Sequence, residues 1–155
     1  MPYMVFGLPT HILLIHAAVV GIPTSCLAVI AIAARPAWRK RFGFKVAVFA
    51  VVMVPVTYAT ELAGEQLFNH NSGLQGLSEV QHHKELGLKM VWFMIAVAVL
   101  AILLVLADRG GYSDNHAIMV VLASLSIAAS AVCIYWVILV GDSGARAVWG
   151  FLGQG

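Results

Sequence analysis

The stretch from Leu86 to Ala107, LGLKMVWFMIAVAVLAILLVLA, decides the fold, because its 22 residues carry a single charge, at Lys89. A helix that crosses the hydrocarbon core of a bilayer needs about 20 predominantly apolar residues. Three further segments of 22 to 24 residues have the same character: 12–34, 46–67 and 117–140. The sequence therefore predicts four membrane-spanning α-helices.

The composition agrees with this interpretation. Hydrophobic residues make up 61% of the chain and charged residues 10%, whereas soluble domains average about 45–50% and about 25%. We expect residues 1–155 to form a single transmembrane domain, an all-α four-helix bundle with lipid as its main solvent. The net charge of +2 is too small to favour a nucleic-acid partner. Cys26 and Cys133 lie within apolar runs and are expected to be packing residues.

The basic residues predict the orientation in the membrane. Six of the nine Lys and Arg residues lie in two connections, 35–45 and 108–116. The positive-inside rule places these connections in the cytoplasm, so both termini and the loop 68–80 are expected outside. The first apolar segment is too long for a signal sequence and should remain in the mature protein. We expect a multi-pass membrane protein.

Titratable residues gather at the predicted outer end of the bundle. This end holds ten of them: His11, His16, Glu61, Glu65, His70, His82, His83, Glu85, Asp142 and Arg146. An ionisable side chain that faced lipid at this depth would be costly. The concentration on one side therefore indicates an outward-facing site between the helices.

Helical geometry divides the candidates into two layers. Glu61 and Glu65 are four residues apart, so they share one face of the second helix, about 6 Å apart along its axis. His11 and His16 are five apart, which separates them by about 140° around the axis. A shallow layer of His11, Glu65 and His83 is expected above a deeper layer of His16 and Glu61. Asp142 and Arg146 on the fourth helix are expected to close the shallow layer.

Several functions fit such a site. Imidazole and carboxylate groups from facing helices can hold a transition metal, with His11, Glu65, His83, Glu61 and His16 as ligands. Two of the histidines His11, His16 and His83 can instead ligate a b-type haem, and His11 with His83 match best in depth. Proton movement toward a quinone or a partner protein through Glu61 and His16 is a third hypothesis.

The protein is accordingly predicted to be an accessory or redox-linked subunit rather than an enzyme by itself. The alternative is a purely structural subunit of a larger envelope or respiratory complex, whose histidines and glutamates only join helices. In either case the expected partners are the lipid bilayer and other membrane subunits or a second copy of the chain.

Four motifs resemble one bacterial membrane family, catalogued as domain of unknown function 2231. They are GLPTHILLIH at 7–16, TELAGEQL at 60–67, HHKELG at 82–87 and GDSGARAVW at 141–149. The last motif is most similar to actinobacterial members. The resemblance implies a four-helix membrane fold in the bacterial inner (plasma) membrane, while fusion of some relatives to Rieske iron–sulfur domains implies a link to electron transfer. This chain departs from the common pattern at Ile12, where many relatives have proline, and at Ala17-Ala18, where many have Phe-Pro.

Overall fold

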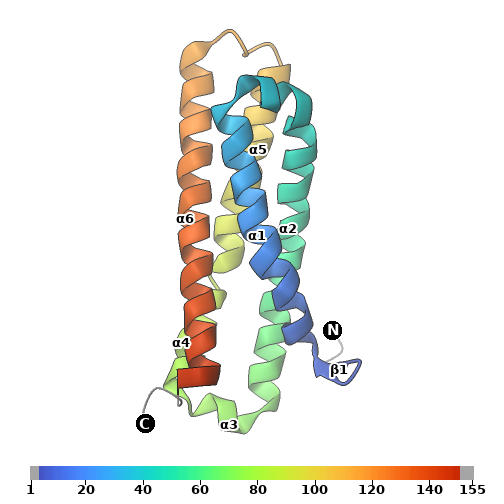
Figure 1. Ribbon diagram of the computed structural model, residues 1–155, viewed down its shortest axis with the longest axis vertical. Helices are drawn as coiled ribbons and strands as arrows, with labels where there is room; N and C mark the ends of the chain where they lie inside the picture. The colour runs from blue at the N-terminus through green and yellow to red at the C-terminus, as the bar shows by residue number, and fades with distance from the viewer. Residues whose placement is uncertain (1–3, 151–155) are drawn as a thin grey trace.

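The computed structural model describes residues 4–150, which form an antiparallel bundle of four long helical segments (Figure 1). Its long helices are α1 (Thr10–Ala34), α2 (Pro36–His70), α4 (Ser78–Gly87) followed by α5 (Met90–Arg109), and α6 (His116–Trp149). Four segments are long and apolar enough to cross a membrane, with α4 and α5 counted together. The predicted all-α membrane bundle is confirmed.

Long helical segments that are consecutive in the chain pack against each other, and α6 closes the ring by packing on α1. The first residue of α1 and the last turn of α6 lie at one end, together with α4 and the short α3 (Ser72–Gln75) (Figure 1). We call this the terminal end. The opposite end holds the α1–α2 turn and the α5–α6 connection, and we call it the basic end because Arg35 and Arg109 lie there.

A two-stranded hairpin precedes α1, which the sequence did not predict. Strand β1 (Met4–Val5) pairs antiparallel with β2 (Leu8–Pro9). The two turn residues, Phe6 and Gly7, both have positive φ, of 53° and 79°. A turn with positive φ at both central residues matches the twist of an antiparallel hairpin.

The turn between α1 and α2 is a single residue. Arg35 is extended, with φ −126° and ψ 101°, because the residue before a proline avoids the helical region. Pro36 then opens α2, where its missing N–H costs no helical hydrogen bond. Helix α1 accordingly ends at Ala34. The prediction that 35–45 is a connection was wrong, because almost all of it is the start of α2.

The third membrane segment is interrupted, whereas the sequence predicted one continuous helix. Helix α4 ends at Gly87 and α5 begins at Met90. The Trp136 indole Nε1–H donates to the Leu86 carbonyl at 3.0 Å, and the Val91 N–H donates to Glu61 Oε1 at 2.8 Å. Backbone groups freed inside a membrane must find protein partners. Two neighbouring helices supply them here, so the interruption is stable.

The core consists of apolar side chains from all four segments. Ile22, Met94 and Val97 are among those fully enclosed. Cys26 and Cys133 are both 0% exposed within this cluster, as expected for packing residues. Outward-facing positions are also apolar, as a lipid-facing surface requires.

A buried ion pair joins three helices at the basic end. Arg39 Nε lies 2.8 Å from Asp108 Oδ1, and the two side chains are 6% and 5% exposed. Arg39 Nη1 also donates to the carbonyls of Ile32 and Ala33, at 3.4 and 3.5 Å. Arg39 therefore donates hydrogen bonds to the C-terminus of α1, whose last carbonyls have no helical partner.

Candidate functional site

His11 stands in the first turn of α1 and joins that helix to α2. Its Nδ1–H donates to the Thr60 carbonyl at 3.0 Å; a carbonyl only accepts, so Nδ1 carries the proton. The ring lies directly against Gly64. A Cβ at Gly64 would be 3.0 Å from His11 Cε1, so only glycine leaves full room for the imidazole.

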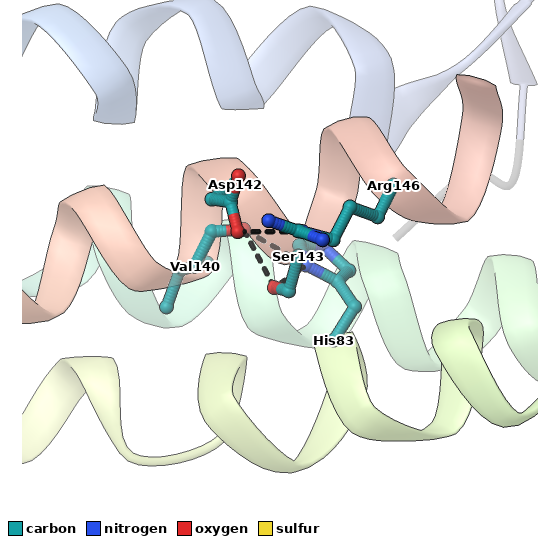
Figure 2. Close-up of polar contacts among 5 residues, drawn as sticks. All are labelled: His83, Val140, Asp142, Ser143 and Arg146. Carbon is teal, nitrogen blue, oxygen red and sulfur yellow. Dashed lines mark hydrogen bonds and ion pairs between the residues drawn. The ribbon is translucent and has the colours of Figure 1, made fainter. Parts of the chain in front are cut away.

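His83 on α4 is held by α6 in the same way. Its Nδ1–H points to the Val140 carbonyl at 3.1 Å and to Ser143 Oγ at 3.0 Å (Figure 2). The Ser143 hydroxyl itself donates to the Val140 carbonyl at 2.9 Å, so it accepts from His83. The ring lies against Gly144, where a Cβ would be 2.9 Å from His83 Cε1.

The two imidazoles are neighbours. Their ring centroids are 6.5 Å apart and their planes are inclined by 68°. In both rings Nδ1 is committed to a backbone oxygen, which leaves the Nε2 lone pair of each neutral imidazole available to a ligand. A backbone carbonyl that holds the second ring nitrogen in this way is typical of metal-ligating histidines.

A cavity of about 700 Å³ opens beside the two rings, between α1, α2, α4 and α6. It is lined by all five predicted ligands: His11, His16, Glu61, Glu65 and His83. Most of its remaining wall is apolar, with Ile22 and Val137 among the lining residues. The cavity is thus an apolar pocket with a few polar groups, the usual character of small-molecule sites.

The expected deep pair of Glu61 and His16 is not formed. One Glu61 oxygen accepts from the Val91 N–H, as described above. His16 is exposed, and its Nδ1–H donates to the Ile12 carbonyl of its own helix at 2.7 Å. Within residues 4–150 no hydrogen bond or ion pair joins the two side chains. The five-residue spacing from His11 turns His16 toward the edge of the bundle.

Glu65 lies at the cavity wall, where its carboxylate is paired with Lys84, another residue that lines the cavity. Its Oε1 is 3.8 Å from Lys84 Nζ, and the two side chains are 40% and 30% exposed. Lys84 also lies over the Phe68 ring, 4.5 Å from its centroid. The sequence did not single out Lys84, although it directly follows His83 in the chain.

The comparison with known proteins agrees with the architecture. A family model described as "Predicted membrane protein (DUF2231)" matches residues 7–153. The chain belongs to this family. No curated protein and no solved structure matches it. The match covers every residue of the His11–His83 site.

In this DUF2231 chain, Asp142 and Arg146 do not close the site as expected. They pair with each other, with Arg146 Nε 2.8 Å from Asp142 Oδ2, and their side chains are 57% and 67% exposed (Figure 2). Neither is among the residues that line the cavity. Ser143, which lies between them in the chain, is the residue that contacts His83. Its position beside Gly144 was the only sequence signal for that role.

The site of this DUF2231 protein also departs from the expected metal cluster. Among the described residues, no group of three or more His, Cys, Asp or Glu side chains is placed to hold a metal ion. What the chain brings together is a pair of neighbouring imidazoles, each held through Nδ1, that line an apolar cavity.

Proposed function

We propose that this protein is a redox-linked membrane subunit that binds a b-type haem between His11 and His83. The observation that carries the proposal is the pair of neighbouring imidazoles, each with Nδ1–H committed to a backbone carbonyl. If one iron were bound between the two Nε2 atoms, the ring centroids would be separated by two metal–nitrogen bonds of about 2 Å and two ring radii of roughly 1 Å. The sum is about 6 Å. The 6.5 Å separation of the rings is close to that value.

The number of available ligands favours haem over a bare metal ion. A metal ion held by protein alone usually takes at least three protein ligands, and no such set is placed for one within residues 4–150. Haem iron needs at most two axial side chains, because its four other ligands are its own. The cavity of about 700 Å³ falls within the range of about 300–1,000 Å³ typical of ligand pockets.

Each residue of the site has a definite task in this proposal. His11 and His83 would hold the haem iron through Nε2, while the carbonyls of Thr60 and Val140 fix the tautomers and raise the basicity of the rings. Gly64 and Gly144 leave room for the imidazoles. The apolar wall limits water at the site. When bound, haem supplies one-electron redox chemistry, and the protein needs no catalytic residue of its own.

A structural role is the competing function, and one observation favours it. His11 already joins α1 to α2, and His83 already joins α4 to α6, through hydrogen bonds that need no cofactor. In this reading the two histidines only fasten the terminal end of the bundle within a larger membrane complex.

Purification from cells supplied with a haem precursor separates the two functions. We expect a Soret band that shifts on reduction, and its loss in His11→Ala and in His83→Ala. His116→Ala is the matched control, because His116 lies at the opposite end of the bundle. A protein that folds, carries no haem and takes none up from added hemin would overturn the proposal in favour of the structural role.

A further inference from the structure

The basic end of α2 carries a second feature, independent of the histidine site. Helix α2 begins at Pro36, about ten residues before the apolar run that starts at Val46. At a rise of 1.5 Å per residue these ten residues extend about 15 Å beyond the hydrocarbon core, whereas the headgroup layer is only about 5–7 Å thick. Residues 41–45 of α2 therefore lie at the depth of the lipid headgroups, and the first turn of the helix extends beyond them.

Two of the charged side chains in this part of α2 share one outer face with Trp38. Successive residues are about 100° apart, which places Trp38, Arg41 and Lys45 within a sector of about 60°. All three are exposed. The opposite face is the buried one, where Arg39 is 6% exposed and Gly43 is enclosed.

The apolar surface below these residues continues the same face. Val48 and Val52 lie within about 20° of the Trp38–Lys45 sector, and they are 45% and 49% exposed. A molecule seated here meets two cations at headgroup depth, with an aromatic ring about one turn above them, and then aliphatic side chains at the depth of the acyl chains.

The two cations are available to a ligand. Neither Arg41 nor Lys45 has an ion-pair partner among residues 4–150. The Arg41 guanidinium lies 5.1 Å from the centroid of the Phe42 ring, which holds it beside an exposed apolar surface. Asp108, an acidic residue at the same end of the bundle, is paired with Arg39 instead.

We propose that this face binds one phospholipid with an anionic headgroup, of the phosphatidylglycerol class. Arg41 and Lys45 hold its phosphate, Trp38 lies about one turn above them on the water side, and an acyl chain runs along Val48 and Val52. Guanidinium and ammonium groups both bind phosphate, and Trp favours the membrane–water interface. A free phosphate ion would use the cations but not the apolar face, so the combination favours a lipid.

Native mass spectrometry of the whole protein in detergent tests the proposal, with phosphatidylglycerol as the probe. We expect Arg41→Gln with Lys45→Gln to weaken binding of the first lipid by about 5-fold per lost charge. Lys40→Gln with Arg109→Gln is the matched control, because it removes the same charge from the same end but not from this face. Far-ultraviolet circular dichroism shows whether both variants stay folded.

Three results would overturn the inference. Equal weakening in the two double variants would mean a general attraction of the basic end. Equally tight binding of zwitterionic phosphatidylcholine would show that the net negative charge of the headgroup has no role. Competition by glycerol phosphate as effective as that by the whole lipid would indicate an anion site without a place for the acyl chain.

Discussion

The carboxylate of Glu61 on α2 accepts a 2.8 Å hydrogen bond from the backbone N–H of Val91, in the first turn of α5. An interrupted membrane helix exposes N–H groups that have no partner in lipid. A negative charge at a helix N-terminus is also favoured by the helix dipole. Glu61, which the sequence suggested as a metal ligand, thus has a clear structural role.

This role predicts different effects for two substitutions of Glu61. Glu61→Ala leaves the Val91 N–H unpaired and should lower the free energy of unfolding by about 1–3 kcal/mol. Glu61→Gln keeps an oxygen acceptor and should cost much less. Thermal unfolding in detergent measures both. Equal losses in the two variants would show that the charge, and not the hydrogen bond, is what the interruption requires.

A second prediction compares the buried ion pair with the exposed one. Asp108→Asn leaves the Arg39 charge, only 6% exposed, without its partner, and such losses cost about 3–5 kcal/mol. Asp142→Asn breaks a pair whose side chains are more than half exposed, where the cost is about 0–1 kcal/mol. Chemical unfolding in the same detergent gives both values. Similar values for the two variants would contradict the structural role of the Arg39–Asp108 pair.

The sequence predicted the fold well because the length of an apolar segment can be compared directly with the thickness of the hydrocarbon core of a bilayer. Apolar segments such as 86–107 fix where helices cross, and Pro36 fixes a helix boundary through its own stereochemistry. The interruption at Leu88 and Lys89 was not predictable in the same way. It depends on hydrogen bonds that join its backbone to Trp136 and Glu61. These two residues are distant in sequence and come close to the interruption only when the helices pack.

The candidate site was predicted in part for a related reason. Helical spacing and depth brought His11 and His83 to one layer, and the rings are neighbours in the structure. The prediction that Asp142 and Arg146 close the shallow layer was wrong, because the last turns of α6 approach the membrane surface. A charged pair there can face water without the free-energy cost of exposing a charge to lipid, so the two side chains need not point into the bundle.

The orientation in the membrane gives a third prediction, from the charges of the basic end. Arg35, Lys40 and Arg109 lie there, and the positive-inside rule places that end in the cytoplasm. A reporter enzyme active only outside the cytoplasm should therefore be active when fused after the last residue, Gly155. The same reporter inserted between Gly110 and Gly111 should be inactive. The reverse pattern would place the His11–His83 site on the cytoplasmic side.

The last prediction uses the glycines that lie against the two imidazoles. A Cβ at Gly64 would be 3.0 Å from His11 Cε1, and a Cβ at Gly144 would be 2.9 Å from His83 Cε1. Gly64→Ala and Gly144→Ala should therefore push each ring from its place and lower haem occupancy, as measured by the Soret absorbance per protein. Alanine favours the helix over glycine by about 1 kcal/mol, so helix propensity does not account for such a loss.

Gly141→Ala is the matched control for these variants. Gly141 lines the same cavity from α6, yet a Cβ there would meet no atom within 4 Å. We expect Gly141→Ala to keep the haem occupancy of the unaltered protein, and Gly144→Ala to lose most of it, although both add one methyl group to the same helix. If Gly144→Ala binds haem as well as Gly141→Ala does, then His83 is not an axial ligand in the position described. A haem bound by the protein would in that case need a different pair of side chains.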